Sequence, residues 1–209
     1  MKRICSGVFA IMVLVSCGSN DTNKTEDHSQ HQTDTTTAAS PTMMSIMHKM
    51  DSDMQQASLT NDPDRDFAQM MKLHHQSAIE MAALELAQGT DTALQRMAAK
   101  MKADQQREIA AFDRFLQANA STTPSDRFAA EFKGTMKAMD HSGYTPGNTM
   151  DAEFINMMIP HHQSGIDMAK VYLKYGTNNE LKEIARNIIS SQAEEIILMQ
   201  GLHGGGKHH

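Results

Sequence analysis

Two adjacent histidine pairs, each preceded by a pair of methionines, are the part of this sequence best suited to chemistry. The two arrays are Met70, Met71, His74 and His75, and then Met157, Met158, His161 and His162. Thioether sulfur and imidazole nitrogen are soft to borderline metal ligands, and this mixture favours Cu(I) over hard cations. The arrays therefore predict a metal site, most readily for copper as Cu(I).

Further candidate ligands accompany these arrays. Met81 and Met168 fall near His74 and His161 on the helix surface if each segment is helical. Weaker candidates come from two other Met-rich segments and from the end of the chain: Met43, Met44, Met47, His48, Met50, Met136, Met139, His203, His208 and His209. Methionine is also a common core filler, and the final histidines could equally be incidental, so this second group ranks below the arrays.

The arrays belong to an internal repeat. Residues 67–82 align without a gap with residues 154–169, at an offset of 87 residues, and the similarity continues downstream. Each copy predicts a short Met-rich helix, a helix with the His-His pair, and a helix that carries Gln and Glu. Repeat one is expected to cover residues 43–118 and repeat two residues 125–202.

Capping and turn signals place the helices that must position the histidines. Asp62-Pro63 is typical of a helix start. Gly89 and Gly176 fall where helices should stop, and residues 177–180 match a capping box. The expected helices lie near 42–58, 63–88, 91–118, 125–140, 151–175 and 178–201. The four long helices should form an antiparallel four-helix bundle from two repeated hairpins, with the short helices added, so the fold class is all-α.

Helical periodicity then assigns side-chain directions. His75 and His162 share stripes with apolar residues, so both should point into the bundle. His74 and His161 are turned from them by about 100°, so each pair should serve two different neighbours or two separate sites. The partner helices carry polar residues in otherwise apolar stripes: Gln105, Glu108, Gln192 and Glu195. Buried carboxylates need partners, so these side chains are expected to orient the imidazoles.

The N-terminus has the pattern of an export signal. Lys2 and Arg3 precede a short apolar run, and residues 14–17, Leu-Val-Ser-Cys, resemble a bacterial lipobox. Residues 1–16 are therefore predicted to be a lipoprotein signal peptide, with Cys17 as the lipidated residue. The alternative is an ordinary secretory signal followed by a chance cysteine.

A polar tether is expected between this signal and the folded domain. Residues 17–40 are almost free of apolar side chains and cannot bury a core. Residues 41–209 are expected to be the helical domain. This organisation predicts an extracytoplasmic protein of the bacterial cell envelope, held to a membrane by its lipid, in an oxidising compartment.

Amino-acid composition limits the possible fold classes and binding partners. The chain has 209 residues, of which 19 are Met, three are Tyr and none is Trp. Such a sequence is a poor sheet former and favours helix, which excludes an all-β fold. The net charge of −6 argues against a nucleic-acid partner.

The repeated motif resembles a known family. Phe-x-x-Met-Met-x-x-His-His-Gln-Ser, followed by Met-Ala and later by Gln-x-x-Glu-Ile, occurs twice and is similar to the bacterial domain-of-unknown-function family 305 (DUF305). The resemblance covers about residues 43–202. It implies a ferritin-like helical bundle, often exported, in a family that includes CopM-type periplasmic copper-binding proteins. The residues that match the hallmark are His74, His75 and Gln76, and His161, His162 and Gln163.

These observations favour an extracytoplasmic lipoprotein that sequesters copper for tolerance or transfers it to an exporter or chaperone. Cu(I) is the expected ion, with Cu(II) at the His-rich ends, and no catalytic motif indicates an enzyme. One alternative is a ferritin-like oxidoreductase with a copper centre or a pair of metal ions such as iron or manganese, although the Glu-x-x-His motif of the iron and manganese class is missing from the sequence. Another is an envelope adaptor that binds no metal.

Overall fold

The structure is a computed structural model that describes residues 41–118, 123–137 and 144–205. Regular secondary structure in these residues consists of six helices: α1 Met43–Gln56, α2 Pro63–Gln88, α3 Thr92–Ala118, α4 Asp126–Lys137, α5 Met150–Tyr175 and α6 Asn179–Gly205. This confirms the all-α prediction. The signal peptide, Cys17, the tether, Met139, His208 and His209 lie outside the described residues. None of the described helices is long and apolar enough to span a membrane.

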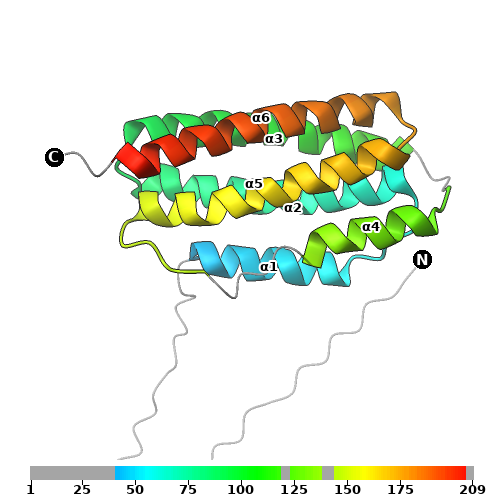
Figure 1. Cartoon of the computed structure of the whole chain (residues 1–209), viewed down its shortest axis with the longest axis horizontal. Helices are drawn as coiled ribbons and strands as arrows, with labels where there is room; N and C mark the ends of the chain where they lie inside the picture. Colours follow the sequence, from blue (N-terminus) through cyan, green and yellow to red (C-terminus); the bar gives the residue numbers. More distant parts are fainter. Residues whose placement is uncertain (1–40, 119–122, 138–143, 206–209) are drawn as a thin grey trace, which may run out of the picture. The chain divides into compact units, whose positions relative to one another are not determined.

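The helices lie in three layers (Figure 1). α2 and α5 form the central layer, α3 and α6 cover one side of it, and α1 and α4 cover the other. α2 and α5 run antiparallel, because Asp64 near the start of α2 contacts Tyr172 near the end of α5, while Asp151 at the start of α5 contacts Thr90 just after α2. The four long helices are thus the expected bundle of two hairpins, and both His-His pairs lie in its central layer.

The helix starts follow local capping chemistry. Asp62 caps α2 by accepting a hydrogen bond from the amide of Arg65, and Pro63 occupies the first turn, as predicted. The predicted capping box at residues 177–180 is wrong, because Asn178 caps α6 through the Leu181 amide at 3.0 Å. The amide and hydroxyl of Thr177 instead donate hydrogen bonds to the carboxylate of Asp64, at the start of α2.

Gly89 and Gly176 end α2 and α5 as expected. Their φ angles are −67° and −60°, so neither needs the left-handed conformation that favours glycine. A Cβ at Gly89 would overlap the Glu85 carboxyl, and a Cβ at Gly176 would overlap the Tyr172 ring. Each glycine therefore makes room for the side chain four residues before it.

The two covering helices differ in what they bury. α1 buries an aliphatic and thioether face: Met43, Ile46, Met47, Met50 and Met54. α4 was expected to be Met-rich as well, but it buries Phe128, Ala129 and Phe132, while Met136 is only partly buried. Phe128 stacks on Phe132 with ring centroids 4.8 Å apart and also meets Tyr175 at the end of α5. Phe128 and Phe132 therefore carry the packing of the described part of this helix, and Met139, the other methionine of the expected Met-rich segment, lies outside the described residues.

Candidate metal centre

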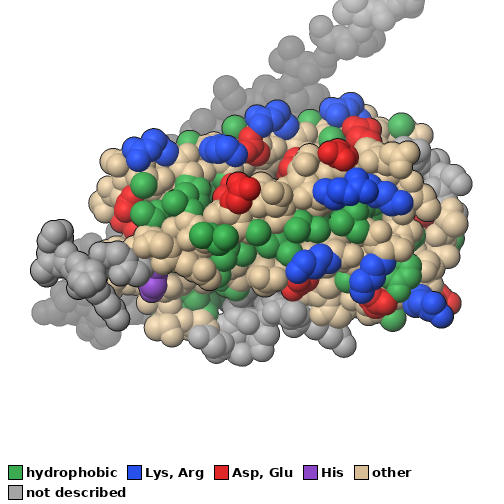
Figure 2. All heavy atoms as spheres, turned by 45° about the horizontal axis from the view of Figure 1, so that its top comes forward, with side chains coloured by type: hydrophobic (Ala, Val, Ile, Leu, Met, Phe, Trp, Pro, Cys, Tyr) green, Lys and Arg blue, Asp and Glu red, His purple; other side chains and the backbone are tan. Residues whose placement is uncertain are grey.

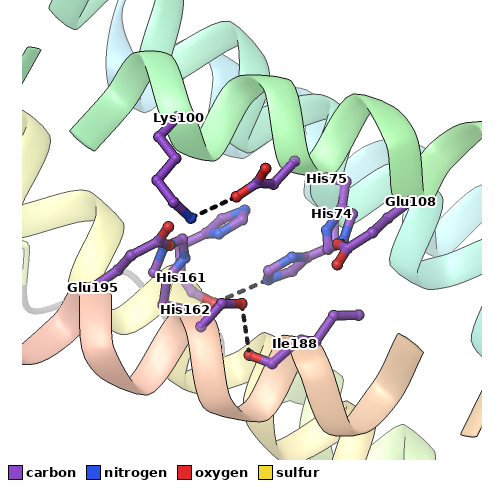
Figure 3. A network of polar contacts seen from close by, with 10 residues as sticks. His74, His75, Lys100, Glu108, His161, His162, Ile188 and Glu195 are labelled. Atoms are coloured by element: carbon purple, nitrogen blue, oxygen red, sulfur yellow. Dashed lines mark hydrogen bonds and ion pairs between the residues drawn. The ribbon is translucent and has the colours of Figure 1, made fainter. Parts of the chain in front are cut away.

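The four paired histidines form a buried row across the central layer. Each is at most 1% exposed. His74 of α2 and His161 of α5 are the inner pair, with ring centroids 3.7 Å apart and planes tilted by 31°. His75 and His162 are the outer pair, and each ring centroid lies 6.1 Å from that of its neighbour in the chain. Figure 3 shows the row, with Glu108 and Glu195 on opposite sides of it.

His74 is held as a neutral donor. Its Nε2 lies 2.9 Å from the carbonyl oxygen of His161 and 3.0 Å from the Ser164 hydroxyl. A carbonyl oxygen can only accept, so Nε2 carries the proton, and Nδ1, which has no hydrogen-bond partner within the described residues, keeps its lone pair. Burial, together with the neighbouring His75, lowers the pKa of His74 well below its usual value. Neutral imidazole is the form that ligates metal.

One hydroxyl joins His161 to a thioether. Ser77 Oγ lies 2.8 Å from His161 Nε2, 3.0 Å from Met50 Sδ and 2.7 Å from the His74 carbonyl oxygen. A hydroxyl has a single hydrogen and cannot donate to all of these groups at once. Ser77 therefore occupies the point at which a sulfur of α1 and a nitrogen of α5 converge.

The outer imidazoles form hydrogen bonds with carboxylates of α3 and α6. His75 Nε2 lies 2.6 Å from Glu108 Oε2 of α3, and His162 Nε2 lies 2.8 Å from Glu195 Oε2 of α6. These are the hydrogen bonds that the apolar stripes led us to expect. The imidazoles are fully buried, whereas the side chains of Glu108 and Glu195 are 20% and 12% exposed. Solvent thus reaches the carboxylates but not the rings.

A groove between α3 and α6 gives access to these carboxylates. It contains a cavity of about 510 Å³ beside Glu108 and one of about 460 Å³ beside Glu195, and Lys100 and Ser191 line both. Figure 2 shows this face, with hydrophobic side chains along it and lysine and arginine side chains on either side. We call His75–Glu108 and His162–Glu195 the outer pairs from here on. Both face the α3–α6 side, while α1 covers the inner pair through Met50.

Gln105 and Gln192 are buried as expected. Their Oε1 atoms have no hydrogen-bond partner within the described residues. Gln192 nevertheless packs beside His74, because a Cβ at Gly165 would lie 2.6 Å from Gln192 Oε1 and 2.9 Å from His74 Cε1. Ala78 holds the equivalent place in repeat one. Gly165 thus makes the close approach of Gln192 possible, and sequence reasoning missed this role.

The methionines divide into buried and peripheral sets. The array and flanking methionines are all fully buried: Met70, Met71, Met81, Met157, Met158 and Met168. Met43, Met47 and Met50 of α1 are also buried, whereas His48 and His203 are exposed and Met44 is partly buried. Met50, initially a weaker candidate, contacts Ser77 through its sulfur, and the same hydroxyl contacts His161. Ser77 and Ser164 were not among the candidates, although both follow the His-His-Gln motif.

The nitrogen and oxygen groups form pairs rather than a closed ligand set. Within the residues that the structure describes, no three side chains among His, Cys, Asp and Glu come together as a metal site. An iron or manganese pair in a ferritin-like bundle uses several inward carboxylates, whereas Cu(I) accepts thioether and imidazole ligands at low coordination number. The donor chemistry around Ser77 fits the softer ion.

The fold and the duplicated histidine motif define the class of protein. The chain belongs to the family described as domain of unknown function DUF305, whose profile matches residues 17–116 and again residues 116–203. The family resemblance inferred from the sequence is thereby confirmed.

Among solved structures, the chain is similar to CopM. CopM in the Cu(I)-bound form is 32% identical, with a TM-score of 0.54, covering 69% of this chain and 98% of that one. CopM in a silver-bound form is 29% identical, with a TM-score of 0.55 and coverage of 69% and 97%. A putative secreted DUF305 protein from Streptomyces coelicolor is 25% identical, with a TM-score of 0.54 and coverage of 72% and 100%. No curated protein matches the sequence.

Proposed function

We propose that this protein binds copper, chiefly as Cu(I), at the inner histidine pair beneath α1. The observation that carries the proposal is the meeting of Met50 Sδ and His161 Nε2 at the Ser77 hydroxyl. A soft cation that takes the place of this hydroxyl would gain a thioether and an imidazole ligand from side chains that already converge. The neutral sulfur needs no deprotonation, so binding at that ligand is independent of pH.

The similarity to CopM supports this choice of metal. Structures of CopM exist in Cu(I)-bound and Cu(II)-bound forms, at 32% and 30% identity to this chain. Copper in both oxidation states is thus compatible with a similar fold. In this chain, His75–Glu108 and His162–Glu195 combine nitrogen with oxygen and open to the α3–α6 groove. We assign Cu(II) to these outer pairs, because nitrogen and oxygen ligands suit it better than thioethers do.

The proposed setting is the bacterial cell envelope. The predicted lipidation of Cys17 and the polar segment 17–40 would hold the domain outside the cytoplasm, anchored to a membrane. In that compartment the protein would sequester copper or transfer it to an exporter or chaperone, without catalysing a reaction. Cu(I) sites built from thioether and imidazole would persist there, because neither group forms disulfides.

The test is an anaerobic Cu(I) titration of residues 39–209, the compact unit that holds all the described helices, against a competing chelator. Met50→Leu and His161→Gln should each weaken Cu(I) binding by about 10- to 100-fold. Met199→Leu is the matched control, since Met199 is equally buried but belongs to α6. Wild-type affinity in both Met50→Leu and His161→Gln would refute the proposed site. No copper binding by the unchanged protein would refute the function itself.

A further inference from the structure

Asp64 ties the α5–α6 turn to the start of α2. Its carboxylate accepts hydrogen bonds from the Tyr172 hydroxyl at 2.7 Å, from the Thr177 amide and hydroxyl at 2.9 and 2.6 Å, and from the Asn178 amide at 3.2 Å. Tyr172 is fully buried, and Gly176 leaves space for its ring. We name this group of contacts the Asp64 latch. It joins the end of α5 and the turn after it to the start of α2.

The equivalent arrangement, related by the repeat, surrounds Asp151 at the start of α5. Asp151 accepts from the Thr90 amide and hydroxyl at 2.9 and 2.7 Å and from the Asp91 amide at 2.9 Å. Each of these donors has its counterpart 87 residues away, in Thr177 and Asn178. We name this group the Asp151 latch. Its fourth donor, the counterpart of Tyr172, falls at Glu85.

Glu85 occupies the place of a hydroxyl donor but carries a carboxyl group. Its side chain is fully buried, and neither carboxyl oxygen has a hydrogen-bond partner within the described residues, although the carboxyl groups of Glu85 and Asp151 interact. The charged groups that act on it are Asp151 of α5 and Asp91 of the α2–α3 turn, both acidic. A second buried carboxylate beside Asp151 would be unpaired and repelled. A protonated carboxyl, by contrast, has one O–H to donate.

We propose that Glu85 is a carboxylic acid that donates its proton to the Asp151 carboxylate, and that the Asp151 latch opens when this proton is lost. This hydrogen bond replaces the one that Tyr172 makes to Asp64 in the Asp64 latch. Gly89 serves this contact as Gly176 serves the other, by leaving room for the side chain four residues earlier. The two latches thus share their backbone and threonine donors, but only the Asp151 latch depends on a carboxyl proton.

The environment of each donor sets the pH at which its latch opens. Burial, followed by the negative charge of Asp151, raises the pKa of Glu85 from 4.5 to about 8. Burial and the contact with Asp64 raise the pKa of Tyr172 far above its ordinary value. Between pH 4.5 and about 8, Glu85 keeps its proton in the folded protein but has lost it in the unfolded chain. The free energy of unfolding therefore falls as the pH rises through this range, and the loss is complete above about pH 8. The Asp64 latch remains closed throughout this range.

The first experiment compares urea unfolding of the purified protein from about pH 5 to about pH 9 with that of Glu85→Gln. The amide introduced by this substitution donates a hydrogen bond but does not titrate. We expect the unfolding midpoint of the wild type to fall across this range by more than that of Glu85→Gln. Glu80→Gln is the matched control, because Glu80 lies on the same helix but is exposed, and it should follow the wild-type profile. Parallel profiles for wild type and Glu85→Gln would overturn the proposal.

A direct titration of the wild type tests the proposal without a variant. With glutamate labelled by ¹³C at the carboxyl carbon, one signal should titrate near pH 8, and it should be the signal missing from Glu85→Gln. The amide resonances of Thr90 and Asp91, which donate to Asp151, should shift with the same midpoint. An ordinary glutamate titration of every carboxyl signal would overturn the proposal.

Discussion

The two repeats carry the same buried histidines under different covers. In repeat one, α1 lies over the middle of α2 and brings Met50 to Ser77. In repeat two, the contacts of α4 fall at the end of α5, where Glu131 binds Lys174 and Tyr175. Both repeats thus carry the histidine row and its carboxylates, while the thioether contact to Ser77 comes from α1. Met139, which corresponds to Met50 in repeat two, lies outside the described residues. We infer that the two outer pairs are equivalent to each other, whereas the two histidines of the inner pair, His74 and His161, are not.

The largest expected difference between the repeats is in aromatic packing. Phe67 stacks on Tyr172 at 4.1 Å and meets Phe112 edge-on at 5.8 Å. The equivalent Phe154 is also fully buried, but the positions that correspond to Tyr172 and Phe112 are Glu85 and Met199. Phe67→Ala should therefore destabilise the protein by about 3–5 kcal/mol, and Phe154→Ala by about 1 kcal/mol less.

Urea unfolding at one pH measures both losses. Equal destabilisation by Phe67→Ala and Phe154→Ala would show that the ring contacts of Phe67 add nothing beyond burial. A larger loss for Phe154→Ala would contradict the comparison outright.

The next effect concerns the outer pairs, which should respond alike. Glu108→Leu and Glu195→Leu each leave an imidazole N–H buried without its acceptor, at a cost of about 1–3 kcal/mol. The two losses should agree because the two contacts are nearly equal in length, at 2.6 and 2.8 Å. Glu108→Gln keeps an acceptor oxygen and should lose less.

Thermal unfolding of the metal-free protein measures these losses, and Cu(I) competition separates them from the metal site. Both leucine variants should keep wild-type Cu(I) affinity, because Met50 and His161 are untouched. A marked loss of Cu(I) affinity in either variant would place the ion at the outer pairs instead.

Much of this arrangement follows from local sequence rules. Helix α2 begins and ends as its N-cap aspartate, Pro63 and Gly89 predict. The pairing of Glu108 and Glu195 with His75 and His162 follows from periodicity, because the direction of a side chain on a helix is set by its position along the helix.

The missed features depend on tertiary packing. Periodicity cannot set how far a covering helix slides along the layer beneath it, so the approach of Met50 and the Phe-lined face of α4 were not predicted. Thr177 fits a capping box locally, but the carboxylate of Asp64, distant in sequence, takes its hydrogen-bonding groups. The Gly89 and Gly176 stops were predicted correctly, but the space that each glycine leaves for a side chain four residues earlier was not.

The smallest expected effect distinguishes the two serines of the inner pair. Ser77→Ala and Ser164→Ala each remove a hydroxyl that hydrogen-bonds a histidine carbonyl, at 2.7 and 2.8 Å, and each should cost about 1 kcal/mol of stability.

The effects of Ser77→Ala and Ser164→Ala on Cu(I) affinity should differ. The Ser77 hydroxyl lies between Met50 Sδ and His161 Nε2 and competes with the ion for both, whereas no methionine sulfur contacts Ser164 within the described residues. Ser77→Ala should therefore raise Cu(I) affinity by about two- to fivefold, roughly 0.5–1 kcal/mol, and Ser164→Ala should leave it unchanged. Chelator competition resolves a difference of this size. Equal responses of the two variants would mean that the ion does not discriminate between the repeats, and that the asymmetry of their covers has no bearing on copper.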